Sequence, residues 1–184
     1  MANTELSVGA ALKPLLPLLA LALALTSAAA CASDRIARES LAQPVFDAAA
    51  FFDGQTTGRG VLKVMFHRTE PTLVDGNGHV APDRSIILDQ TVRRGHRPPA
   101  HRQWQLHPDG AGGYTGTLTD AIGPVTGSVL GNRLRLSFAM KGGLRAEQLL
   151  YLDASGRIVH NTMVIRKFGI PVGRLDETIT HDAR

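Results

Sequence analysis

The stretch Arg133-Leu-Arg-Leu-Ser-Phe-Ala-Met-Lys141 decides the fold of this chain. Apolar and polar residues alternate along it, so that Leu134, Leu136, Phe138 and Met140 share one face while the arginines and the serine share the other. This period of two predicts a β-strand with one face buried. Because four large apolar side chains in a row need a cover, the strand must belong to a sheet that closes on itself or packs against a second layer.

Turn residues separate this strand from similar runs on both sides. Gly131-Asn132 precedes it and predicts a tight turn from a partner strand, and Asp109-Gly110 and residues 153–156 predict further turns. The nine strands expected from these runs cover residues 58–68, 85–94, 102–107, 113–118, 123–130, 133–141, 145–152, 157–167 and 172–180. Because most links are short, they predict an antiparallel meander.

A long meander leaves two sheet edges exposed unless it curls and closes. We therefore predict an all-β fold, an antiparallel meander closed into a barrel, and the glycines at 113, 116 and 127 fit strongly coiled strands. A β-sandwich would satisfy the same alternation, although the hairpin-rich connections favour the barrel. An outer-membrane barrel is disfavoured, since Arg133 and Arg135 would then face lipid.

A short helix is expected before the strands. Residues 44–52 suit one, with Pro44 in the first turn and Gly54 at the end. Residues 32–43 are polar and unpatterned, which is typical of a tether. The barrel domain is therefore expected over residues 44–184.

Residues 1–30 have the organisation of a cleaved signal peptide. Leu15–Leu25 is an apolar core of 11 residues, which is too short to span a bilayer. Small residues follow it, and Cys31, the single cysteine of the chain, comes directly after Ala30. Ordinary secretion with cleavage after Ala30 would leave Cys31 as a free thiol.

The residues Ala28-Ala29-Ala30-Cys31 resemble a bacterial lipobox. This resemblance implies that Cys31 is lipidated and that residues 31–43 tether a periplasmic domain to a membrane of the cell envelope. Ala32 and Ser33 follow the cysteine in place of an aspartate, which favours the outer membrane.

Charge and length bound the remaining possibilities. The chain carries 20 Lys and Arg against 16 Asp and Glu, a net charge of +4. No basic run with interleaved aromatic residues predicts a nucleic-acid partner. Removal of residues 1–30 leaves 154 residues, a length that suits one domain with a core of its own.

Several short motifs occur in order through the rest of the chain. They are Phe51-Phe52-Asp53-Gly54, Arg102-x-Trp104, Gly113-Tyr-x-Gly116, Asp120-x-x-Gly123, Gly127-x-x-x-Gly131-Asn132, and Lys167-Phe168-Gly169-Ile170 with Gly173. With these motifs the chain resembles domain-of-unknown-function family 3833, bacterial lipoproteins grouped with the lipocalin-like (calycin) barrels. Residues 70–80 and Gly123-Pro124 depart from the family pattern. The resemblance implies a lipocalin-like barrel on a lipid anchor, and it implies no reaction.

No catalytic or metal-binding pattern stands out. The seven histidines are scattered, and His96 and His101 are spaced for neither a helix face nor a strand face. Gly127-Ser-Val-Leu-Gly131 holds its serine in the wrong place for a nucleophile elbow. We therefore expect no enzyme, no metal and no cofactor.

Arg102 and Trp104 are two residues apart in one expected strand and so point to the same face. If that face lines the barrel, Trp104 supplies an apolar wall and Arg102 a cation for a carboxylate or phosphate. The alternative is a core tryptophan that closes the barrel with an arginine stacked on it. The stripe of Leu134, Leu136, Phe138 and Met140 completes the candidate ligand-binding face.

The sequence thus predicts an exported, lipid-anchored barrel that binds or carries a small apolar molecule such as a lipid. The alternative is a non-binding accessory or assembly lipoprotein of the cell envelope that uses the outer face of its barrel. A large apolar void in the barrel would favour the first function, and a filled interior would favour the second.

Overall fold

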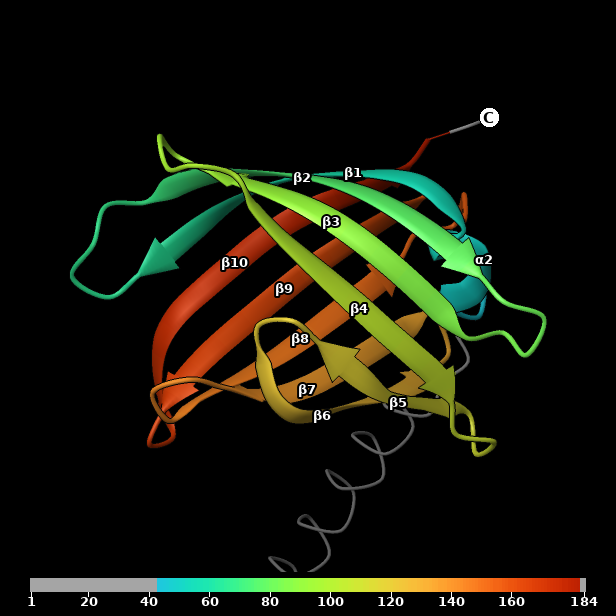
Figure 1. Cartoon of the computed structure of the whole chain (residues 1–184). Helices are drawn as coiled ribbons and strands as arrows, with labels where there is room; N and C mark the ends of the chain where they lie inside the picture. Colours follow the sequence, from blue (N-terminus) through green and yellow to red (C-terminus); the bar gives the residue numbers. More distant parts are fainter. Residues whose placement is uncertain (1–42, 183–184) are drawn as a thin grey trace, which may run out of the picture. The chain divides into compact units, whose positions relative to one another are not determined.

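The computed structural model describes residues 43–182 of the chain, which form one helix and ten strands (Figure 1). The helix is α2 (Ala48–Phe52). The strands are β1 (Gly54–Val64), β2 (Glu70–Val80), β3 (Ile86–Arg94), β4 (Ala100–Pro108), β5 (Gly113–Leu118), β6 (Ala121–Leu130), β7 (Arg133–Met140), β8 (Leu144–Leu152), β9 (Ile158–Lys167) and β10 (Ile170–His181). The predicted signal peptide and Cys31 lie outside the described residues.

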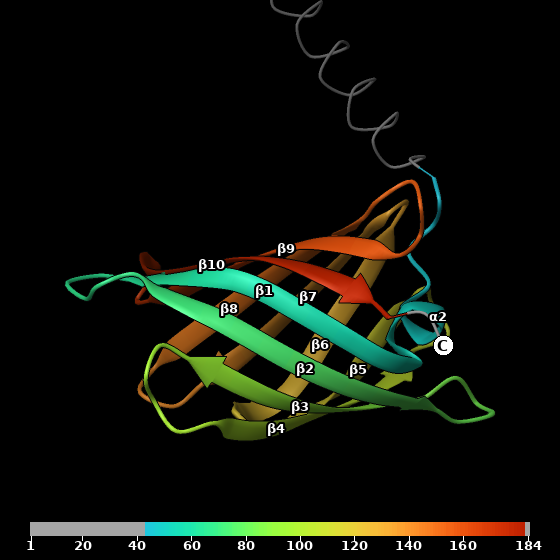
Figure 2. The ribbon, with the colours of Figure 1, turned by 90° about the horizontal axis from the view of Figure 1, so that it is seen from above.

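The strands form a closed antiparallel barrel in which each strand pairs with the next along the chain. Pairing of β1 with β10 closes it, with Thr57 opposite Thr180 and Val64 opposite Gly173. Figure 2 shows the same closure from a second direction, with β1 lying between β2 and β10. The predicted meander and the predicted barrel are both confirmed.

The strand β7, from which the fold was predicted, buries the face that its alternation assigns to the interior. In β7, Leu134, Leu136 and Phe138 are buried, whereas Arg135 is exposed on the outer face. The backbones of β4 and β5 approach each other closely, because a Cβ on Gly116 of β5 would collide with the carbonyl oxygen of Gln105 on β4. The strand glycines therefore allow the tight coiling that was expected of them.

One strand was missed, so the barrel has ten strands where nine were predicted. β2 has glycine at two of its inward positions, Gly76 and Gly78, which interrupts the apolar alternation. Both are places of close approach: a Cβ on Gly78 would meet the carbonyl oxygen of Phe52, and one on Gly76 would meet the hydroxyl of Thr56. The first predicted strand was also displaced, since β1 ends at Val64 and residues 65–68 form the turn.

The predicted helix over 44–52 is shorter than expected and begins at Ala48. Asp47 caps it, because its Oδ1 accepts a hydrogen bond from the Ala50 amide at 3.0 Å. Pro44 therefore lies before the helix and not in its first turn, and Gly54 is already the first residue of β1. Phe46, Phe51 and Phe52 are buried at the end of the barrel where α2 lies.

The two ends of the barrel differ in how well their inward side chains are shielded. At the α2 end the inward residues Ile86, Leu88, Trp104, Leu106, Leu150 and Val159 are all buried. Farther along the same or neighbouring strands the inward residues Val92, Arg94, Arg102, Met140, Met163 and Ile165 are partly exposed. The interior is therefore closed at the α2 end and open to solvent at the opposite end, which we call the hairpin end.

Candidate functional site

A group of polar side chains crosses the interior of the barrel between these two ends. Gln90 on β3 joins two members of it, since its Oε1 accepts hydrogen bonds from Arg102 Nε at 2.8 Å and from Trp104 Nε1 at 3.0 Å. The guanidinium of Arg102 also lies 5.9 Å from the centroid of the Trp104 ring. This geometry fixes the direction of the cation inside the barrel.

A second pair approaches from β9 and β10. Asn161 and Glu177 are directly opposite in the ladder, and Asn161 Nδ2 donates to Glu177 Oε2 at 2.9 Å. The amide oxygen of Asn161, Oδ1, and the second carboxyl oxygen of Glu177, Oε1, have no hydrogen-bond partner among the described residues. Buried polar atoms without partners are rare in folded proteins and call for an explanation.

Glycines on β1 make room for this carboxylate. A Cβ on Gly58 would collide with Glu177 Oε1, and one on Gly60 would lie 2.8 Å from the Glu177 Cβ. The side chain of Glu177 therefore occupies space that any larger residue at these two positions would fill.

Glu177 and the group around Gln90 line the same small internal cavity of about 30 Å³. Its polar lining comes from Gln90, Arg102, Gln148 and Glu177, and its apolar lining comes from Phe52, Ile86, Leu88, Trp104, Leu106, Leu150 and Ile179. A space of this size holds about one water molecule. The closed half of the barrel is therefore filled by side chains, and the polar group forms the floor of the open half.

The electrostatics of the interior follow from burial. Burial raises the pKa of Glu177, and the hydrogen bond from Asn161 and the charge of Arg102 only partly oppose this rise. Burial likewise lowers the pKa of Arg102, against the charges of Glu177 and Asp120. The charges of Arg102 and Glu177 thus each favour the charged form of the other, against the effect of burial.

The structure brings the sequence-predicted residues into one interior, although in different surroundings. Arg102 and Trp104 line the cavity. Leu134, Leu136 and Phe138 are packed core, and Phe138 meets the Trp104 ring edge-on at 5.5 Å between centroids. Met140 is partly exposed towards the hairpin end. The stacked-arginine geometry weighed for Trp104 is present, and the ligand-binding role of these residues remains a prediction.

Sequence reasoning missed Gln148, Asn161 and Glu177. Each occupies an inward position of its strand, and the flanking inward neighbours are apolar, as Leu175 and Ile179 are for Glu177. A polar residue in the apolar phase of an alternating strand is the signal that could have found them.

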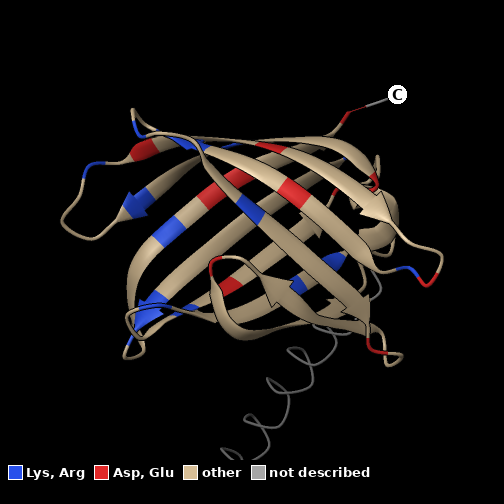
Figure 3. Ribbon diagram, in the orientation of Figure 1, with Lys and Arg blue, Asp and Glu red and all other residues tan. Residues whose placement is uncertain are grey.

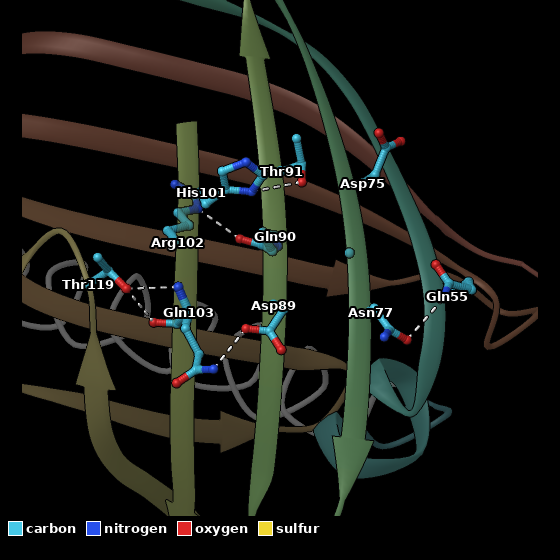
Figure 4. Close-up of a pocket in the computed structure, with 11 residues that line it drawn as sticks. Gln55, Asp75, Asn77, Asp89, Gln90, Thr91, His101, Arg102, Gln103 and Thr119 are labelled. Atoms are coloured by element: carbon cyan, nitrogen blue, oxygen red, sulfur yellow. Dashed lines mark hydrogen bonds between the residues drawn. The ribbon is translucent and has the colours of Figure 1, made fainter. Parts of the chain in front are cut away.

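A larger hollow of about 360 Å³ is lined by outward-facing side chains of β1–β4 and also by Gln90 and Arg102 of the interior group (Figure 4). Its side chains bond to one another: Gln55 Nε2 donates to Asn77 Oδ1 at 3.0 Å, and Gln103 Nε2 donates to Asp89 Oδ1 at 2.8 Å. Thr119 Oγ1 accepts a hydrogen bond from the main-chain N–H of Gln103 at 2.8 Å. Because these polar groups satisfy each other, the interior group with its unpartnered oxygens is the stronger candidate site.

No group of three His, Cys, Asp or Glu side chains within residues 43–182 converges as metal ligands would. No helix in this part of the chain is long and apolar enough to cross a membrane.

Comparisons with known proteins agree with this architecture. The profile of one family, described as "Protein of unknown function (DUF3833)", matches residues 25–181. A search of curated proteins finds no match. The S-type phycobiliprotein lyase CPES from Guillardia theta is similar in structure, with a TM-score of 0.59 and 10% identity over 74% of this chain and 91% of that chain.

A DUF3598-family protein of unknown function from Nostoc punctiforme is similar too, with a TM-score of 0.58 and 10% identity. That alignment covers 76% of this chain and 51% of the other, so this chain spans about half the length of that protein. At such low identity, both likenesses show the barrel fold alone.

Proposed function

The chain belongs to the family described as Protein of unknown function (DUF3833), a membership that brings no activity with it, and we propose that it binds one small, mostly apolar molecule in its barrel. The observation that carries the proposal is the polar group at mid-barrel, with Glu177 Oε1 and Asn161 Oδ1 unpartnered below a mouth open to solvent. An apolar pocket with a few convergent polar groups is the usual form of a small-molecule site.

The chemistry of the group suggests the kind of molecule. Arg102 supplies a cation, which would pair with a carboxylate or phosphate head. Burial raises the pKa of Glu177, which favours the neutral form of this carboxyl group and so weakens its repulsion of an anionic head. Met140, Met163 and Ile165, which are partly exposed nearer the mouth, would contact an apolar tail. We therefore propose a lipid-like acid as the ligand.

The similarity of the barrel to a phycobiliprotein lyase supports a binding role only in general, because it concerns the fold. We further propose that the protein is exported, lipidated on Cys31 and anchored in the periplasm, with the outer membrane favoured. This part is supported by residues 1–31, whose sequence resembles a lipoprotein signal peptide.

Titration of the purified full-length chain with a fluorescent fatty acid tests the binding role. We expect saturable uptake, and we expect Arg102→Met to weaken it by about 10- to 100-fold, the worth of a hydrogen bond to a charged group. Arg59→Met removes a cation from the outer face of β1 and should leave uptake unchanged. Equal affinities for Arg102→Met and the unsubstituted chain would contradict the role given to Arg102.

One observation favours the alternative function. The internal cavity of about 30 Å³ is too small for a fatty-acid chain, so a ligand must occupy the open half or displace side chains. If the chain takes up no probe, the accessory or assembly role, in which the outer face of the barrel meets a partner, is the better account.

A further inference from the structure

Two turns at the hairpin end present aromatic side chains to solvent. Phe66, between β1 and β2, is 97% exposed, and Phe168, between β9 and β10, is 87% exposed. The two turns are neighbours, because the Met65 amide donates to the Val172 carbonyl at 2.9 Å. Ile170, which is 60% exposed, lies beside them. In Figure 1 the β1–β2 hairpin projects beyond the barrel on the side away from α2.

The backbone at both phenylalanines is unusual. Phe66 has φ of 64° and Phe168 has φ of 50°, which is the left-handed region where glycine and asparagine are favoured. A bulky side chain there costs conformational energy, and an exposed ring gains no burial in return. Folding therefore does not account for an aromatic residue at either turn, so a role outside the barrel is the better explanation.

Basic side chains surround the two turns. Lys63, Arg68 and Lys167 are near them, and Lys167 Nζ lies 5.8 Å from the centroid of the Phe168 ring. Figure 3 shows Lys and Arg gathered at this end of the barrel. The loops at the α2 end carry both signs of charge, with Asp83, Asp109 and Asp153 beside Arg84 and Arg157. Charge is thus distributed unevenly along the barrel, with its basic side at the exposed phenylalanines.

A shallow hollow of about 530 Å³ lies beside these turns on the outer side of β1, β9 and β10. The side chains of Lys63, Arg166 and Arg174 line it together with the apolar side chains of Met65 and Val164. Lys63 has no ion pair among the described residues, whereas Arg166 lies 3.5 Å from Glu147 and Arg174 pairs with Asp176. Cations beside exposed apolar groups form the arrangement that meets an anionic headgroup and the upper part of an acyl chain together.

We propose that the hairpin end docks on an anionic lipid bilayer, with the rings of Phe66 and Phe168 inserted at the level of the headgroups. Aromatic rings favour this interfacial layer, and basic residues near it are attracted to anionic lipids. Two projecting tips fit a soft surface better than the flat, closely packed patch of a protein interface.

The inference concerns a different surface from the proposed ligand site and stands if that site proves empty. The two are nevertheless compatible, because the barrel interior opens at the same end. A molecule in the bilayer could then reach Arg102 and Glu177 without crossing bulk water.

Quenching of an introduced tryptophan by brominated lipids tests the docking. Full-length Phe66→Trp is mixed with vesicles of phosphatidylcholine and phosphatidylglycerol whose acyl chains carry bromine. The matched control is Leu130→Trp, since Leu130 is 50% exposed at the α2 end, and the unsubstituted chain supplies the background of the buried Trp104. We expect fluorescence loss and a blue shift for Phe66→Trp beyond both references.

The charge dependence is tested on the same background. Arg68→Gln with Lys167→Gln should reduce the quenching, as should vesicles of phosphatidylcholine alone, whereas Arg59→Gln should not. No quenching of Phe66→Trp beyond the Leu130→Trp control would overturn the proposal. A blue shift that arises without vesicles, from contact between copies of the chain, would also overturn it.

Discussion

Asn161 and Glu177 face each other across β9 and β10 inside the barrel, joined by one hydrogen bond of 2.9 Å, and each keeps one oxygen without a partner among the described residues. Both side chains point into the barrel, and each lies between apolar inward neighbours on its own strand. Burying their polar atoms lowers the stability of the fold unless another group forms hydrogen bonds with them. The pair therefore marks the place where the barrel departs from a simple core.

The raised pKa of Glu177 predicts how stability depends on pH. The folded protein holds the proton of Glu177 more tightly than the unfolded chain does. The contribution of Glu177 to the free energy of unfolding is therefore fully present at low pH. It declines as the pH rises from the ordinary carboxyl pKa towards the raised one. Glu177→Gln should remove this decline and unfold at higher denaturant concentration at neutral pH.

Asp176, the next residue, is the control for that experiment. Its bond to Arg174 lowers its pKa, so its contribution is present above the ordinary carboxyl pKa and lost as the pH falls. Asp176→Asn should therefore remove this loss, so that it changes the dependence of stability on pH on the acid side. If Glu177→Gln and the unsubstituted chain gave the same denaturant midpoints at every pH, the buried state of Glu177 would be refuted.

The alternation in β7 predicts different costs on its two faces. Leu136 and Phe138 are each 4% exposed, and replacing either with alanine should cost about 2–5 kcal/mol of unfolding free energy. Arg135→Ala, on the outer face, should cost about 0.5 kcal/mol or less, since its bond to Glu147 is on the surface. Equal losses at Arg135 and Leu136 in urea melts would contradict the assigned faces.

Met140 and Leu134 lie at opposite ends of the same apolar face and should respond differently to added volume. Met140→Trp enlarges a partly exposed residue near the mouth, so it should weaken fatty-acid uptake with little loss of stability. Leu134→Trp enlarges a fully buried residue and should cost about 1–3 kcal/mol through overpacking. Thermal melts with parallel probe titrations measure both, and a Met140→Trp variant that melts early but binds normally would count against an open mouth.

The proposed anchor predicts a change of compartment. Cys31→Ser removes the sulfur to which acyl chains would be attached, and the protein should move from the membrane fraction to the soluble periplasmic fraction. Fractionation of cells that express each form measures this shift. A wild-type protein that is already soluble would show that cleavage leaves an ordinary secreted chain.

The strands could be predicted where the sequence alternates cleanly, as in β7, because alternation alone specifies which side chains a sheet buries. β2 was missed because its inward glycines are required by the nearby Phe52 carbonyl and Thr56 hydroxyl, contacts that only the folded barrel creates. The predicted start of the helix was wrong because Asp47 caps a helix that begins at Ala48, so that Pro44 lies before the first turn in which it was expected.

The candidate site was predicted in part. Arg102 and Trp104 could be placed on one face because they are two residues apart in a strand. Their partner Gln90 and the facing Glu177 come from other strands, and no spacing along the chain shows that they meet. The packing position of α2 likewise determines which end of the barrel is open, and the alternating pattern does not predict that position.

Native mass spectrometry of the protein purified from the cells that produce it tests the binding role most directly. The account predicts a species heavier than the protein by the mass of one lipid-like acid, and Arg102→Met should lose it while Arg59→Met retains it. A protein recovered without any bound molecule in both the unsubstituted and Arg59→Met forms, together with no saturable uptake of fatty acid, would contradict it.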